Sequence, residues 1–220
     1  KKNSYVFSLT IIGLLYFIFG FITWLNNLLI PFLKTACQLP DSTAYLVTFA
    51  FYISYFIMAL PSSWILKKTG FARGMSLGLL VMAVGSLVFI PAARERSYIL
   101  FLVGLFVQGT GLALLQTAAN PYVTILGPIE SATKRMSIMG LFNKVAGIIG
   151  IFVLSKALLS NFDTVTTNIQ KASGNAQINL LNQLASRIIT PYIIIAIGLV
   201  LLAVMVYIAN LPDIEPEETI

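Results

Sequence analysis

Six long apolar stretches make up most of this 220-residue chain and limit what it can fold into. None contains an aspartate or a glutamate, and a helix of about 20 mostly apolar residues is long enough to cross a bilayer. Only 10% of the residues are charged, against about 25% in a typical soluble domain, so the chain lacks the polar surface that a soluble fold needs. Unbroken apolar runs also favour helices over a membrane barrel, whose strands alternate polar and apolar residues. We therefore predict an all-α membrane protein with six transmembrane helices, at about 8–33, 44–66, 75–93, 99–126, 138–160 and 189–211.

Basic residues in the connections predict the orientation. The start of the chain and the connections after the second and fourth spans carry seven lysines and arginines, and the opposite connections carry five. Because cytoplasmic loops are enriched in lysine and arginine, we expect both ends of the six-helix unit in the cytoplasm. The acidic stretch 213–220 then begins a cytoplasmic linker, and the polar segment 161–188 lies outside as a long loop with a short surface helix. Because the chain begins at Lys1 rather than at a methionine, we expect a processed chain or part of a longer one.

Several functional classes are disfavoured by what the sequence lacks. The net charge of +6 comes from short clusters between apolar runs, so no nucleic-acid partner is expected. There is no histidine, which excludes a histidine metal site or proton relay, and no metal or other cofactor is expected. The spans hold no carboxylate pair and the chain has no phosphate-binding loop of the P-loop type, so an enzyme is the least favoured class.

Polar side chains inside two spans mark a candidate binding site. In the first span Thr23 and Asn27 are four residues apart and share one helix face. Gln116 and Asn120 share a face of the fourth span in the same way, and a proline follows within four residues of each pair. The first and fourth spans open two inverted three-helix repeats, and corresponding interrupted helices in two such repeats point to a transporter's binding site. The alternative is that the amides join the helices structurally.

The chemistry of this cluster suits a neutral, polyhydroxylated ligand. Carboxamides donate and accept hydrogen bonds without a charge, and a tryptophan face can stack on the C–H surface of a sugar. Lys144 is either a switching group for ion coupling or a side chain that reaches the cytoplasmic edge of the membrane. Gln108 is a weaker candidate for the lining of the binding cavity. The predicted substrate-binding residues are Asn27, Gln116, Asn26, Asn120, Asn143, Trp24 and Tyr52.

The run 111–128, GLALLQTAANPYVTILGP, resembles the fourth helix and following loop of the fucose–galactose–glucose:proton symporter family of the major facilitator superfamily. Supporting stretches occur in the expected order, WLNNLLIP at 24–31, FYISYF at 51–56 and LKKTGFARG at 66–74. The resemblance covers essentially the whole chain. It implies a twelve-helix permease of the bacterial inner membrane that works by alternating access. This chain would be the N-terminal six-helix half, with the sugar bound between the two halves.

Two departures from that family bear on substrate and coupling. L-fucose symporters carry an aspartate at the position of Asn27 and a glutamate at that of Gln116. The glutamine resembles the glucose/galactose branch, which moves the expected substrate toward a hexose. An amide does not titrate, so either proton coupling does not run through this half or Asn27 is not the native residue. We expect ion-coupled sugar symport, with a uniporter, a sodium-coupled carrier, or a sugar receptor or scaffold without transport as the alternatives.

Overall fold

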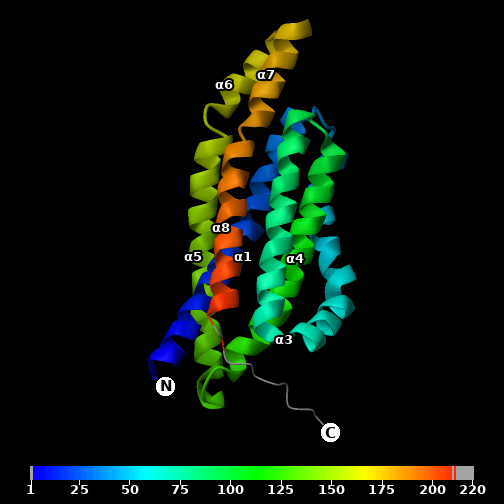
Figure 1. The fold of residues 1–220 in the computed structure, drawn as a ribbon. Coiled ribbons are helices and arrows are strands. Elements are labelled where there is room, and N and C mark those ends of the chain that lie inside the picture. The colour runs from blue at the N-terminus through cyan, green and yellow to red at the C-terminus, as the bar shows by residue number, and fades with distance from the viewer. Residues whose placement is uncertain (1, 210, 212–220) are drawn as a thin grey trace.

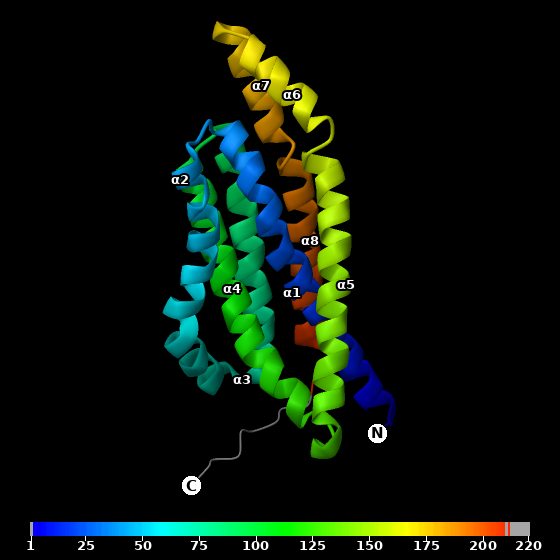
Figure 2. The ribbon, with the colours of Figure 1, turned by 180° about the vertical axis from the view of Figure 1, so that it is seen from behind.

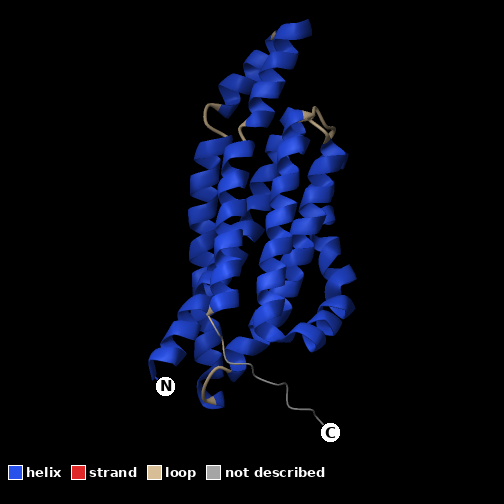
Figure 3. Ribbon diagram, viewed as in Figure 1, coloured by secondary structure: helices blue, strands red, loops and turns tan. Residues whose placement is uncertain are grey.

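The computed structural model describes residues 2–209 and 211, and every regular element in this part of the chain is helical (Figure 3). Five helical segments of this part are long and apolar enough to cross a membrane. The elements are α1 Lys2–Ala36, α2 Asp41–Ala44, α3 Leu46–Arg94, α4 Tyr98–Ile125, the short 3-10 helix η1 Ile129–Ser131, α5 Ala132–Leu158, α6 Phe162–Lys171, α7 Gly174–Ser186 and α8 Ile189–Ile208. The acidic stretch 213–220 lies outside the described residues.

The 49-residue helix α3 turns back on itself at Gly70. A straight helix of this length would measure about 74 Å, more than twice the roughly 30 Å of a bilayer's hydrocarbon core. Gly70 has φ 75° and ψ 172°, which costs glycine little because it has no Cβ. The chain therefore reverses between a first arm, residues 46–69, and a second arm, residues 71–94, which run in opposite directions (Figures 1 and 2). These arms carry the spans predicted at 44–66 and 75–93.

The helices pack in pairs that correspond between the first three and the last three spans. A Cβ on Gly20 of α1 would lie 1.9 Å from the backbone oxygen of Asn143 in α5, so these two backbones touch. Gly109 of α4 meets the first arm of α3 in the same way, at the Phe51 carbonyl. The second arm packs against α8. Exchanging the first three spans with the last three maps the α1–α5 pair onto the α4–first-arm pair, which is the pairing that two inverted repeats produce.

The prolines in α1 and α4 do not interrupt these helices, which corrects the expectation of broken helices. Pro31 and Pro121 both lie inside continuous helix. Each lacks one backbone N–H, so the carbonyls of Asn27 and Thr117, four residues earlier, receive no helical hydrogen bond from it. Both prolines are exposed. The prolines therefore leave carbonyl acceptors near the accessible surface instead of ending the helix.

Segment 161–188 forms two helices, α6 and α7, instead of a loop with one short helix. The pair extends beyond one end of the bundle (Figure 1). Its Asn-, Gln-, Ser- and Thr-rich composition reads as a loop, but Ile169 and Leu181 are buried. The Arg187 guanidinium donates a hydrogen bond to the carbonyl oxygen of Ser160 at 2.7 Å, which joins the end of α7 to the segment after α5.

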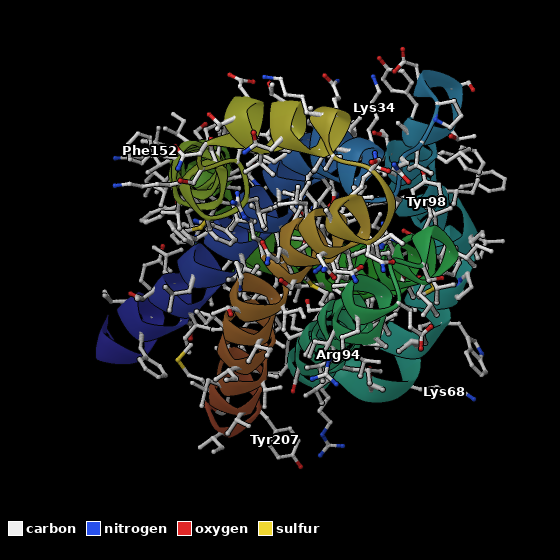
Figure 4. The ribbon with its side chains drawn as sticks, turned by 90° about the horizontal axis from the view of Figure 1, so that it is seen from above. Lys34, Lys68, Arg94, Tyr98, Phe152 and Tyr207 are labelled. Carbon is white, nitrogen blue, oxygen red and sulfur yellow. The ribbon has the colours of Figure 1, made fainter. Side chains whose placement is uncertain are left out.

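The two ends of the bundle differ in the connections that they carry. α1 begins and α8 ends at one end, where α3 also reverses and α4 connects to α5, while α6 and α7 project from the other end (Figures 1 and 2). Seen from above, Phe152 of α5 and Tyr207 of α8 project outward from the bundle (Figure 4), with 73% and 64% of their surface exposed. The basic connections that follow the first arm and α4 therefore share one end, as the orientation argument requires.

Cysteine labelling tests the predicted orientation. We expect a membrane-impermeant maleimide to label Asn175→Cys, in α7, on intact cells, and to label Lys68→Cys only after permeabilisation. Both positions are exposed, whereas Gly70 itself needs its positive φ and is left unchanged. The reverse pattern would contradict a cytoplasmic location for both ends of this unit.

The native thiol is expected to be a slow labelling site. Cys37, the one cysteine of the chain, is half-buried, and its Sγ lies 3.7 Å from the carbonyl oxygen of Arg96. Burial raises the pKa of Cys37 to about 11, and the charge of Arg96 only partly opposes this. Because the thiolate is the nucleophile, maleimide should react slowly with Cys37 at pH 7.5 and faster as the pH rises toward 11. Any cysteines in the rest of the complete protein are replaced by serine. The labelling rate of Asn175→Cys serves as the reference for an exposed thiol. Equal rates at pH 7.5 would contradict the burial of Cys37.

Candidate functional site

Asn26 and Asn27 occupy different environments although they are adjacent in α1. Asn27 is exposed, whereas Asn26 is 2% exposed and neither of its amide atoms has a hydrogen-bond partner among the described residues. Consecutive residues of an α-helix point about 100° apart, so only one of the two faces the accessible side. The structure thus encloses Asn26 within the bundle, and its contribution to ligand binding stays a prediction.

The two predicted amides of α4 both have partners on other helices. Gln116 is half-buried, and its side chain is the hydrogen-bonding partner of the Tyr55 hydroxyl on the first arm of α3. Asn120 is exposed and lies one turn closer to the α5 connection, where its Oδ1 accepts a hydrogen bond from the Tyr16 hydroxyl at 2.6 Å. α4 therefore holds its amides between α1 on one side and α3 on the other.

Tyr16 of α1 joins three helices. Its hydroxyl contacts Asn120 of α4, and its backbone carbonyl accepts a hydrogen bond from Asn143 Nδ2 of α5 at 3.4 Å. Sequence reasoning missed Tyr16, because a tyrosine inside an apolar span reads as a packing residue. The available signal was its position eleven residues, or about three turns, before Asn27, which places both on one face of α1.

The predicted residues form a column along the bundle instead of one ring. Asn27 lies about 16 Å along α1 from Tyr16, and Gln116 lies about 6 Å along α4 from Asn120. Because Tyr16 and Asn120 are in contact and α1 and α4 run in opposite directions, Asn27 and Gln116 differ in height by about 10 Å along the bundle. Whether both line one cavity stays a prediction.

Trp24 and Lys144 meet at the interface between α1 and α5. The Trp24 ring fills the space above Gly147, where a Cβ would lie 2.4 Å from the ring. Lys144 Nζ lies 5.6 Å from the centroid of the same ring, within the range of a cation–π contact. Lys144 is exposed and lies beside the predicted site, so its role in coupling stays a prediction.

Tyr52 lies on the exposed side of the first arm. Its surface is 47% exposed, and its ring centroid is 5.2 Å from that of Phe51 and 6.0 Å from that of Tyr55. Since Tyr55 is the partner of Gln116, Tyr52 is linked to the candidate site through one aromatic neighbour.

Gln108 is a packing residue in this structure, which corrects its status as a cavity candidate. It is 1% exposed, and its Nε2 donates to Ser86 Oγ at 2.8 Å. Ser86 in turn donates to the carbonyl of Met82 within its own helix. The amide therefore joins α4 to the second arm of α3, where it has no access to a ligand.

Arg135 has a structural role that its place in a basic cluster did not reveal. It is 3% exposed, although we counted it among the orientation charges. Its guanidinium donates to the carbonyl oxygens of Val123 at 2.9 Å, Thr124 at 2.8 Å and Pro128 at 3.0 Å. A cation from the first turn of α5 thus caps the C-terminal end of α4.

Two apolar grooves lie on other parts of the surface. One, of about 420 Å³, lies between the first arm of α3 and α4, and includes Phe49 and Phe106. The other, of about 460 Å³, lies between α1, α5 and α8, and includes Phe21 and Arg187. Neither contains a predicted site residue.

Known proteins match almost the entire chain. The chain is 37% identical over 218 residues to the glucose/galactose transporter of Brucella abortus biovar 1 (strain 9-941), covering 99% of the chain and 50% of that protein. It is 32% identical over 218 residues to the L-fucose-proton symporter of Escherichia coli (strain K12), with the same two coverages. It is 36% identical over 219 residues to the putative glucose/galactose transporter of Helicobacter pylori (strain ATCC 700392 / 26695), covering 99% of the chain and 51% of that protein. The chain spans about half the length of the curated relatives it matches.

Solved structures match over the same extent. The fold is similar to a crystal structure of the Escherichia coli fucose:proton symporter FucP, with a TM-score of 0.80 and 33% identity over 95% of this chain and 50% of that one. A crystal structure of FucP in the outward conformation gives a TM-score of 0.82 at 33% identity over 97% of this chain and 53% of that one. These matches confirm the family resemblance and the predicted fold of a half-transporter.

The family assignment follows from the extent of these matches. The model of the Major Facilitator Superfamily matches residues 12–219, which is nearly the whole chain. Together with the long apolar helices, this makes the chain part of a multi-pass membrane protein. The chain belongs to the Major Facilitator Superfamily.

Proposed function

We propose that this chain forms one six-helix half of a sugar transporter of the bacterial cytoplasmic membrane, which moves a hexose by alternating access. The observation that carries the proposal is the column of uncharged amides on α1, α4 and α5, in a chain 37% identical to a glucose/galactose transporter. Amides recognise hydroxyl groups without attracting a counter-charge, which suits a neutral sugar. The relatives named for glucose, galactose and L-fucose support the same ligand class.

The second half of the transporter would cover the exposed side of α5 and of the first arm of α3. The first arm exposes Phe56, Leu60 and Trp64, which are 81%, 84% and 60% exposed. The same arm carries Tyr52 and the Gln116 partner Tyr55, so this apolar surface borders the candidate site. A sugar held between two such halves would reach one side of the membrane at a time as the halves tilt.

Ion coupling by protons would require a group that can carry a proton. Asn27 and Gln116 cannot carry a proton, so in a proton symporter the coupling group would be Lys144 or would lie in the second half. A uniporter or a sodium-coupled carrier would need neither. The L-fucose-proton symporter among the relatives favours a proton.

Counterflow of labelled D-glucose into proteoliposomes preloaded with unlabelled D-glucose tests the proposal, because it requires carrier turnover but no ion gradient. We expect the complete protein to show counterflow that excess unlabelled D-galactose inhibits. Accumulation is then measured with an imposed proton gradient, with a sodium gradient and with neither, which separates symport from uniport. Sugar-dependent thermal stabilisation without counterflow would favour the receptor alternative. If glucose, galactose and L-fucose all fail to bind and all fail to show counterflow, the proposal is contradicted.

A further inference from the structure

Tyr16 constrains the orientation of two candidate amides at once. Its hydroxyl carries one proton and donates it to Asn120 Oδ1, at 2.6 Å. Its carbonyl oxygen can only accept, so the Asn143 carboxamide must turn its Nδ2 toward it, as the 3.4 Å contact shows. One residue of α1 therefore occupies the acceptor of one amide and the donor of the other.

The remaining hydrogen-bonding groups of these two amides are complementary. Asn120 keeps the N–H groups of Nδ2, and Asn143 keeps its Oδ1 as an acceptor. No hydrogen bond to either group is formed within the described residues, and neither side chain is fully buried. A hydroxyl group is both a donor and an acceptor, so a ligand with several hydroxyls can use an N–H group from α4 together with an oxygen from α5.

The surroundings of Tyr16 hold it in place for this role. Its ring is 7% exposed and lies 4.9 Å from the ring centroid of Phe19, and its hydroxyl is also 3.7 Å from Met136 Sδ. One turn further along α1, Gly20 brings the backbone of Asn143 against α1. A buried, packed tyrosine restricts the rotation of its amide partners more than solvent would.

We infer that Tyr16 is a positioning residue for sugar recognition. It fixes Asn120 as a hydrogen-bond donor and Asn143 as an acceptor toward the sugar hydroxyls, without touching the sugar itself. This inference rests on the proposed function, since it assigns to the same site the polarity with which each amide meets its ligand.

A double-mutant cycle on the complete protein tests the inference. The dissociation constant of D-glucose or D-galactose, whichever binds more tightly, is measured for the unaltered protein, Tyr16→Phe, Asn120→Ala and the double variant. We expect Tyr16→Phe to weaken binding about threefold to tenfold, because Asn120 then rotates freely. In the Asn120→Ala background the same change should have almost no effect, because its target is gone. A purely structural tyrosine would give additive losses, which would overturn the inference.

Two further variants separate positioning from general loss of packing. Tyr98→Phe removes a tyrosine hydroxyl that donates to the backbone oxygen of Thr43, away from the site, and should leave sugar affinity unchanged. Asn120→Asp can still accept from Tyr16 but has no N–H group for the sugar, so it should lose as much affinity as Asn120→Ala. This second comparison holds even where Tyr16→Phe does not fold. Retained affinity in Asn120→Asp would overturn the donor assignment.

The outcomes distinguish this inference from the proposed function. If the unaltered protein binds none of D-glucose, D-galactose and L-fucose, both are overturned. Sugar binding that Tyr16→Phe leaves unchanged would overturn the positioning role alone.

Discussion

Gly20→Ala is expected to leave little folded protein. The added Cβ would lie 1.9 Å from the carbonyl oxygen of Asn143 and 2.7 Å from its carbonyl carbon. These are backbone atoms, so no side-chain rotation relieves the overlap, and α1 and α5 would have to separate by roughly 1.5 Å. We expect a loss of about 3 kcal/mol or more. Fluorescence-detected size-exclusion chromatography of the complete protein after heating measures it as a lower melting temperature and a smaller monodisperse peak.

Gly13→Ala is the matched control within the same helix. The nearest atoms to a Cβ at this position are Met139 Sδ and an atom of the Phe142 ring, both at the ordinary contact distance of 3.9 Å. Alanine has the higher helix propensity, so this variant should be as stable as the unaltered protein or slightly more so. A normal melting temperature for Gly20→Ala would contradict the close contact between α1 and α5. Equal losses in both variants would point to a general effect on α1.

Gln116→Leu is expected to weaken sugar binding strongly while the protein still folds. Leucine has a similar volume but no hydrogen-bonding group, so a sugar hydroxyl in the site would lose its partner at a cost of about 1–3 kcal/mol, or roughly 5- to 150-fold in affinity. The Tyr55 hydroxyl would lose its partner as well, which predicts a smaller loss of thermal stability. Isothermal titration of the purified complete protein with D-glucose or D-galactose measures the first effect.

Gln183→Leu provides the same chemical change away from the bundle. Gln183 is exposed on α7, beyond the end of the spans, and this variant should bind sugar normally. Sugar affinity that Gln116→Leu leaves unchanged would refute the assignment of Gln116 to the site. An equal loss in both variants would show that the substitution acts through something other than the site.

The helices were predictable from sequence because a bilayer imposes a length and a composition. Each predicted span is a run without acidic residues. In lipid such a run has to form its backbone hydrogen bonds internally, and a helix does this within one segment. A break near Gly70 could also be predicted, because this glycine lies between Lys67-Lys68 and Arg73, in the polar stretch that separates two apolar runs. The α6–α7 pair was not, since a polar composition does not exclude helices that bury only a few apolar residues.

For the candidate site, the sequence suggests residue types but not their geometry. Amides inside a span need partners, and this argument found Gln116 and Asn120, both of which have one. It did not separate Asn26 from Asn27, because their difference depends on which face of α1 meets the other helices. Tyr16 was missed because its carbonyl and its hydroxyl contact residues more than 100 positions away, and the helix face that it shares with Asn27 does not by itself reveal those contacts.

The arginine that caps α4 has a consequence for how the protein responds to acid. Arg135 binds backbone carbonyls and the Ser131 hydroxyl, and within the described residues it forms no ion pair with a carboxylate. A carboxylate latch opens when it is protonated, but neither a guanidinium nor a carbonyl changes its protonation between mild acid and neutrality. The hydrogen bonds that Arg135 makes at the corner between α4 and α5 are therefore expected to persist from mild acid to neutrality.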